Sequence, residues 1–187
     1  HPIWFENQGG WQNPKAVDYF ARFAKKAAEV FGSEVQFWIT INEPMVFIYF
    51  SYLTGEWPPG VRSYDASMHV LRHLIFAHVR AYDAIHHHYD KALKRPVWVS
   101  IAKHLTYTTP CRPNSWQDKL TVKLRQWFVN DMMLNALDSG FLFFPSVFAE
   151  YLSKRKTLDF IGVNYYTHDF LRFAGLAQFD ALGSVCD

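Results

Sequence analysis

Short runs of β-forming residues alternate along the chain with longer runs that carry apolar residues at helical spacing. The clearest short run, residues 35–44, reads VQFWITINEP. In an extended conformation one face carries Val35, Phe37, Ile39 and Ile41, and the other carries Gln36, Trp38 and Thr40. Because neither face is charged, the run predicts a strand buried on both sides, as in a parallel sheet covered by helices.

Helical runs lie between the β-type runs. Asn13 is a good N-cap and Pro14 suits the first helical position, so a helix is expected from Asn13-Pro14 to a stop at Gly32. The other expected elements are helices over residues 66–89, 115–138 and 146–155, and strands over 96–101 and 158–166. The alternation of helix and strand predicts an α/β fold with a parallel sheet and right-handed crossovers.

Glu43 follows directly after the first of these strands. The carboxyl edge of a parallel sheet or barrel is where α/β enzymes usually place their chemistry. Pro44 blocks easy continuation of regular structure and restricts the turn that holds Glu43. A glutamate after a strand is more often a solvated turn residue, but this turn predicts a carboxylate that is held firmly and faces a pocket.

Two strings give the chain a resemblance to a known family. Residues 38–44, WITINEP, resemble the acid/base signature T-x-N-E-P of the retaining β-glycosidases of glycoside hydrolase family 1, and residues 158–166, LDFIGVNYY, resemble that family's sixth barrel strand. The resemblance implies that residues 1–187 are a single domain fragment of a TIM-barrel glycosidase. The fragment would hold about strands 4 to 6 of the (β/α)8 barrel with their helices, because a complete barrel needs about 250 residues.

The same resemblance implies roles for particular residues. Glu43 matches the acid/base, and Asn42 matches the residue that hydrogen-bonds the sugar 2-hydroxyl. Tyr166 matches the tyrosine that keeps the nucleophile ionised and aligned, and Asn164 matches a polar residue of the same pocket. Residues two positions apart in a strand point to the same side, so Asn164 and Tyr166 are expected to face the site together. This chemistry requires no metal and no organic cofactor, and the expected partner is a carbohydrate substrate.

An acid that works near neutral pH needs a raised pKa, which apolar surroundings or a second carboxylate can supply. Trp38, Phe47 and Tyr49 are the aromatic residues expected around Glu43. Trp57, in the loop with Pro58, fits a sugar platform and loop packing equally well. These residues together predict an apolar site around the carboxylate.

The second carboxylate of the mechanism is not found in this sequence. The resemblance implies a nucleophile in a T-E-N-G-like string on a seventh strand, and no such string follows Tyr166. The carboxylates of the tail lie in no matching context, and no role is assigned to Asp169, Asp180 or Asp187.

Two functions therefore stay open. One is hydrolysis of β-linked glycosides, with this chain supplying the acid/base half of the site. The other is a non-catalytic glycosidase-like protein that binds sugar or a protein partner. In either case an open half-barrel exposes sheet edges and apolar surface, so the chain alone is expected to be inactive and to associate with the rest of the barrel or with itself.

Composition removes several other classes of function. Hydrophobic residues make up 50% of the chain and aromatic residues 18%, which is a globular composition. The net charge is +2 and the basic residues form no stripe, so no nucleic-acid surface is expected. No apolar stretch reaches the roughly 18 residues needed to span a membrane.

The cysteines and clustered histidines suggest no metal site. Cys111 and Cys186 lie far apart without metal-type spacing, and free thiols are favoured over a disulfide. Adjacent residues of a helix point in different directions, so residues 86–88, three histidines, predict a solvated helix end. His69 and His73 are spaced i, i+4 without an evident acidic third ligand, which favours packing.

Overall fold

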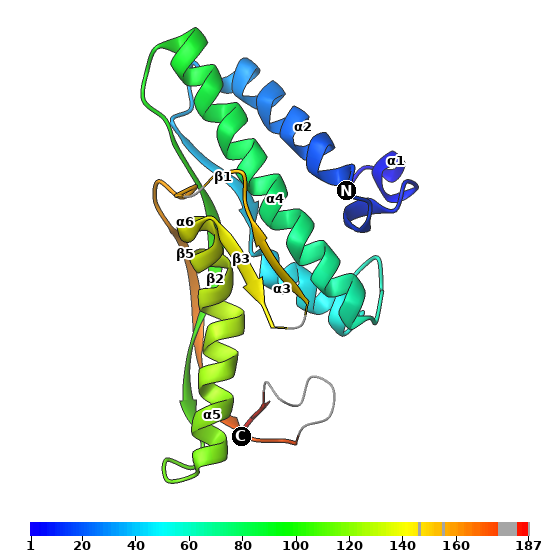
Figure 1. The fold of residues 1–187 in the computed structure, drawn as a ribbon, viewed down its shortest axis with the longest axis vertical. Coiled ribbons are helices and arrows are strands. Elements are labelled where there is room, and N and C mark those ends of the chain that lie inside the picture. Colours follow the sequence, from blue (N-terminus) through cyan, green and yellow to red (C-terminus); the bar gives the residue numbers. More distant parts are fainter. Residues whose placement is uncertain (146, 155, 176–182, 187) are drawn as a thin grey trace.

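The computed structural model describes residues 1–145, 147–154, 156–175 and 183–186. Its main sheet has the strand order β1-β2-β5-β6 (Figure 1). In this sheet β1 (Phe37–Asn42), β2 (Trp98–Pro110) and β5 (Gly162–Arg172) are parallel, and β6 (Ser184–Val185) runs antiparallel to β5. The predicted parallel sheet of an α/β fold is confirmed.

The predicted long helices are present, with small changes in their bounds. Asn13 Oδ1 accepts a hydrogen bond from the backbone N–H of Lys15 at 2.9 Å, and α2 (Ala16–Phe31) begins just after this turn. The helix predicted over residues 66–89 is α4 (Tyr64–His88), which continues as the π-helical turn η3 (Tyr89–Leu93). The helix predicted over 115–138 consists of α5 (Trp116–Arg125), the π-helical turn η4 (Gln126–Asp131) and α6 (Met132–Ser139).

Helix α4 forms the centre of the core. It lies beside α2 and also contacts β1 and β2 (Figure 1). The buried side chains of α4 that join the main core include Val70, Leu71, Leu74 and Ile75. The shorter helical elements are α1 (Ile3–Glu6), η1 (Gly10–Gln12), α3 (Pro44–Ile48) and η2 (Tyr49–Leu53). Among the described residues, no helix has the length and apolar character to cross a membrane.

A β-hairpin stands where the sequence predicts a short helix over residues 146–155. Strand β4 (Phe148–Tyr151) pairs antiparallel with β3 (Phe141–Phe144), so that prediction is wrong. Cross-strand aromatic contacts stabilise such a pair, and the rings of Phe141 and Tyr151 lie 4.9 Å apart. Arg72 of α4 donates two hydrogen bonds to Glu150, at 2.5 and 2.8 Å, and fixes the hairpin to the helix. Tertiary pairing therefore overrides the local helical pattern.

Strand β1 is covered on one face only, which corrects the prediction of a strand buried on both sides. Trp38 donates to the Tyr89 hydroxyl at 3.0 Å, and Thr40 bonds His78 of α4 at 2.7 Å. On the other face Phe37 is 63% exposed and Ile39 is 42% exposed. The physical reason is that the described helices pack on one side of this strand, and no described element covers the other.

Strands β2 and β5 extend beyond their predicted ends. The sequence predicts strands over residues 96–101 and 158–166, whereas β2 reaches Pro110 and β5 spans Gly162–Arg172. The two strands stay paired as far as Pro110 and Leu171. Backbone pairing thus continues past the point where the apolar side-chain pattern ends.

Cys111 and Cys186 form a disulfide, and the expectation of free thiols is wrong. The backbone N–H of Cys111 donates to Leu171 O at 2.8 Å, and that of Cys186 donates to Phe170 O at 2.9 Å. These contacts with β5 place the two Cα atoms 6.5 Å apart, within the range that a disulfide bridges. Because the cysteines are 75 residues apart in sequence, only the strand pairing reveals their proximity.

Candidate active site

Glu43 occupies the turn between β1 and α3. Its backbone is left-handed, with φ 47° and ψ 55°, a conformation that is uncommon for a residue other than glycine. Its N–H donates to Ala102 O of β2 at 2.8 Å, and its own carbonyl accepts from the N–H groups of Val46 and Phe47, each at 3.1 Å. Pro44 fills the first position of α3, so the expectation that it blocks regular structure is wrong, because its fixed φ suits the first turn of a helix. The backbone therefore fixes the direction in which this carboxylate leaves the sheet.

The structure brings the four residues singled out from the sequence together. Asn164 Nδ2 of β5 donates to Glu43 Oε1 at 2.8 Å and lies 3.0 Å from Asn42 Oδ1. The Tyr166 hydroxyl also donates to Glu43 Oε1, at 3.1 Å. Asn164 and Tyr166 thus face the same side of β5, as their spacing predicts. One carboxylate oxygen of Glu43 receives both donors, which fixes the side chain at the edge of the sheet.

The hydrogen bond from Tyr166 has an electrostatic consequence. Together with desolvation and the charge of the Glu43 carboxylate, it raises the pKa of the Tyr166 phenol above its usual value. The phenol therefore stays protonated and keeps its role as a donor throughout the neutral range. The family resemblance implies that this hydroxyl bonds the nucleophile, but within the described residues it bonds Glu43.

His104 lies beside the site although the sequence did not single it out. Its ring stacks on that of Tyr166, with centroids 5.6 Å apart and planes 23° apart. It pairs with Asn164 in the β2–β5 register. The local sequence does not reveal this pairing, because the two residues lie about sixty positions apart. Such a separation is expected, since parallel strands require a long crossover connection.

Lys103 is a second residue that sequence reasoning missed. Its side chain is fully buried, and its Nζ donates to the carbonyl of His104 at 3.1 Å and to that of Val129 in η4. Burial lowers the pKa of Lys103 to about 8, an effect opposed by the carboxylates of Asp131 and Glu43. A lysine inside the apolar run VWVSIAKHL is the signal that could have identified it.

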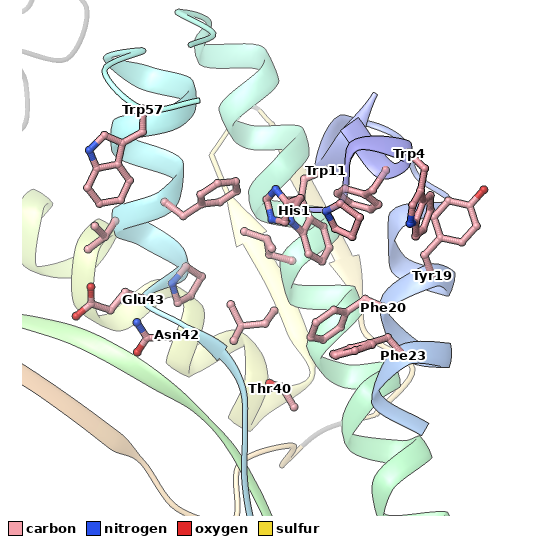
Figure 2. Close-up of a pocket in the computed structure, with 17 residues that line it drawn as sticks. His1, Trp4, Trp11, Tyr19, Phe20, Phe23, Thr40, Asn42, Glu43 and Trp57 are labelled. Carbon is pink, nitrogen blue, oxygen red and sulfur yellow. The ribbon is translucent and has the colours of Figure 1, made fainter. Parts of the chain in front are cut away.

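A pocket of about 670 Å³ lies on one side of Glu43 and Asn42 (Figure 2). Aromatic side chains dominate its lining, which includes His1, Trp4, Phe5, Trp11, Phe20, Phe23, Phe47 and Trp57. Trp57 stacks on Phe50, with centroids 4.7 Å apart, which confirms its expected packing in the loop, and it also lines this pocket, so its role as a sugar platform stays a prediction. The expectation that Trp38 surrounds Glu43 is wrong, because Trp38 packs with Tyr89 behind β1.

A second pocket of about 380 Å³ also has Glu43 in its wall. It lies between the α3–η2 segment and strands β2 and β5, and its lining includes Tyr49, His104, Arg125, Tyr166 and Asp169. Phe47 and Tyr49 therefore stand on different sides of Glu43, one at each pocket. Glu43 therefore lies between two neighbouring cavities.

The other candidate groups in the described residues bond partners other than Glu43, although Asp169 lines the second pocket with it. His73 is buried and bonds Trp11 O at 2.8 Å, and His86 bonds Asp159 at 2.7 Å. Over the ranges that the structure describes, no group of three or more metal-binding side chains comes together. Asp169 pairs with Arg125 at 3.6 Å, whereas Asp180 and Asp187 lie outside the described residues.

Comparison with known proteins identifies the class to which this sheet and site belong. The solved structure of a family 1 β-glucosidase from Thermotoga maritima matches with a TM-score of 0.82 and 26% identity, over 100% of this chain and 42% of that chain. The model of Glycosyl hydrolase family 1 matches residues 1–179. The chain belongs to this family, and its fold is part of a (β/α)8 barrel.

Two curated relatives mark the range of activities among similar proteins. A β-galactosidase of Pyrococcus woesei is 34% identical over 178 residues, which cover 89% of this chain and 34% of that protein. A probable inactive β-glucosidase 14 of Oryza sativa subsp. japonica is 28% identical over 212 residues, which cover 97% of this chain and 38% of that protein. The chain spans less than half the length of either relative.

Proposed function

We propose that the protein containing this chain hydrolyses β-linked glycosides by a retaining mechanism and that this chain supplies the acid/base half of the site. The observation that carries the proposal is the fixed carboxylate of Glu43, which accepts from Asn164 at 2.8 Å and from Tyr166 at 3.1 Å. It lies at the carboxyl end of a parallel strand, the position that barrel enzymes use for catalysis. Strands β1, β2 and β5 would be barrel strands 4, 5 and 6.

Glu43 would act twice in this mechanism. In the first step the bond between sugar C1 and the leaving oxygen breaks, the oxygen keeps the bonding electrons and takes the Glu43 proton, and a nucleophilic carboxylate bonds C1. In the second step the Glu43 carboxylate takes a proton from water, whose oxygen replaces the nucleophile at C1. The nucleophile would come from a strand outside the described residues.

The neighbouring polar residues would position the sugar and the carboxylates. Asn42 would hydrogen-bond the 2-hydroxyl, a contact that strengthens in the transition state. Asn164, which bonds both Asn42 and Glu43, would hold the two side chains in register. Tyr166 would exchange its bond to Glu43 for one to the nucleophile when both carboxylates are present, because a phenol has a single O–H to donate.

Substitution of Glu43 by glutamine tests the proposal. We expect Glu43→Gln to lower kcat/KM for an alkyl β-glucoside by about 10²–10⁴-fold, the usual contribution of a general acid–base. An aryl β-glucoside with a good leaving group should lose less in the first step, because its oxygen needs less protonation. Glu29→Gln is a matched control, since Glu29 pairs with Lys26 on the exposed face of α2. Equal losses for both variants would contradict the role of Glu43.

The second candidate function is sugar or protein binding without catalysis. It is favoured by one observation on the carboxylates of the two pockets. Among the residues that the structure describes, Asp169 is the one carboxylate besides Glu43 that lines either pocket, and it is paired with Arg125. A protein that binds methyl β-glucoside but turns over neither alkyl nor aryl glucosides would support this function. Turnover that depends on Glu43 would exclude it.

A further inference from the structure

Lys103 is a fully buried titratable group that the proposed mechanism does not use. Its Nζ donates to the carbonyl of His104 at 3.1 Å and to the carbonyl of Val129 in η4. Both acceptors belong to residues that line the second pocket beside Glu43. The amine of Lys103 therefore lies behind the wall of that pocket, where two backbone groups hold it.

Backbone contacts fix Lys103 relative to Glu43. The residue before Lys103, Ala102, accepts the backbone N–H of Glu43 at 2.8 Å. The residue Asn130 of η4 donates to Thr106 O at 2.9 Å, on the other side of Lys103 along β2. These bonds tie β2 both to the turn of Glu43 and to η4. The amine of Lys103 is therefore held in one place, with little freedom to move away from the site.

The amine of Lys103 interacts electrostatically with the Glu43 carboxylate. Burial lowers the pKa of Lys103 to about 8, and the carboxylates of Asp131 and Glu43 oppose this shift. An attraction between two charges acts on both partners, so a charged Lys103 favours the ionised form of Glu43 to the same extent. Because Lys103 is excluded from water, dissolved salt should screen this attraction only weakly.

Other charged or titratable side chains lie around the same two groups. Asp131 of η4 accepts from Gln126 at 3.5 Å, and Arg125 pairs with Asp169 at 3.6 Å, so these two charges offset each other. The further titratable side chains of the two pockets are His1, Tyr19, Tyr49, His104 and Tyr166. In the described part of the chain the hydrogen-bond partners of Lys103 are neutral carbonyls, so no bonded carboxylate cancels its charge.

We propose that Lys103 is a positioning residue that sets the alkaline limit of the acid step through its charge on Glu43. This inference rests on the proposed hydrolysis, in which Glu43 must be protonated to give its proton to the leaving oxygen. The charge of Lys103 favours loss of that proton, so it lowers the pH above which the acid step fails. The same charge favours the ionised Glu43 that takes a proton from water in the second step.

The pH dependence of kcat/KM for an alkyl β-glucoside tests this role in the protein that contains the chain. Lys103→Met removes the charge and keeps an unbranched apolar side chain, a type of change that buried sites often tolerate. The alkaline limb should move to higher pH by about one unit, as expected for two charges near each other in a partly buried site. Lys103→Arg keeps the charge and should leave the limb at its wild-type position. Lys119→Met, at an exposed position of α5, should do the same.

The position of the limb separates an electrostatic role from a structural one. A packing defect would lower kcat/KM by the same factor at every pH and would leave the limb in place. An alkaline limb that does not move in Lys103→Met would therefore overturn the inference, whatever the loss of activity.

A reciprocal measurement requires neither turnover nor the Lys103→Met variant. The protein is labelled with ¹³C at the lysine Cε and titrated by NMR, and the Lys103 signal is the one absent from Lys103→Arg. Because coupling is reciprocal, Glu43→Gln should lower the titration midpoint of Lys103 from about 8 by about one unit. Glu29→Gln should leave this midpoint unchanged, since Glu29 pairs with Lys26 on the exposed face of α2.

The two measurements distinguish failure of the inference from failure of the proposed function. If the wild-type protein hydrolyses neither alkyl nor aryl β-glucosides, the proposed function fails, and the NMR titration alone decides whether Lys103 and Glu43 are coupled. A Lys103 midpoint that is the same in wild type and in Glu43→Gln would overturn the inference even if the wild-type protein is active.

Discussion

Removal of the disulfide between Cys111 and Cys186 should weaken the protein considerably. The bridge joins the end of β2 to β6 and closes a loop with a sequence separation of 75 residues. Chain entropy alone assigns a bridge across a loop of this size a stabilisation of about 4 kcal/mol at 25 °C. Strand β6 is expected to depend on this bridge, because within the described residues its ladder with β5 is short, with Val185 opposite Leu171 and Ser184 opposite Arg172.

Urea unfolding of the Cys111→Ser/Cys186→Ser double variant measures this contribution. With a slope of about 2 kcal/mol per molar urea, the midpoint should fall by about 2 M. Wild-type protein in reductant should unfold with the double variant, and wild-type protein without reductant should unfold later. Intact mass with and without alkylation establishes whether the bridge is present. An oxidised wild type that unfolds at the same urea concentration as the double variant would refute the reasoning.

Three further predictions concern stability and association. Burial lowers the pKa of Lys103 from 10.5 to about 8, so between these pH values the unfolded chain binds more protons than the folded protein. The free energy of unfolding should therefore rise with pH in this range. Lys103→Met should remove that rise, as measured by urea unfolding at about pH 8 and pH 10. Hydrogen bonds from Arg112 and the Phe173 N–H lower the pKa of Asp118 below its usual value of 3.8. Asp118→Asn should therefore be less stable than wild type at about pH 7. As the pH falls below about 4, the variant should lose less further stability than wild type, because it has no carboxylate to protonate at this position. The isolated 187-residue chain should sediment as associated species, because Phe37 and Tyr165 are more than half exposed, and a single monomer peak would contradict this.

The four site residues could be predicted because the family resemblance implies them and because the residues of each pair lie close together in the sequence. Asn42 and Glu43 are adjacent in one turn, and Asn164 and Tyr166 alternate along one strand. The two segments meet because β1 and β5 lie on either side of β2 in the parallel sheet. A family resemblance in two strings therefore contained enough information to predict the group, although the roles of its members stay proposals.

Features that depend on distant pairing could not be predicted in the same way. The hairpin of β3 and β4 replaces a predicted helix because each strand completes the other's hydrogen bonds. The Arg125–Asp169 pair joins α5 to β5, and the Cys111–Cys186 bridge joins the residue after β2 to the residue after β6. The sequence around each of these residues does not specify its partner. The contacts depend instead on how the strands are paired in the folded protein.

On one face of β1 the apolar side-chain pattern predicts burial, whereas the described elements leave that face exposed. Phe37 and Ile39 are apolar as a buried strand requires, yet they stay exposed because no described element packs over them. Glu43 does not share this dependence, since its backbone is bonded to β2 and its carboxylate to β5. The geometry of the proposed acid/base half is thus contained within β1, β2 and β5. Covering Phe37 and Ile39 should therefore change association and stability more than it changes the position of the Glu43 carboxylate.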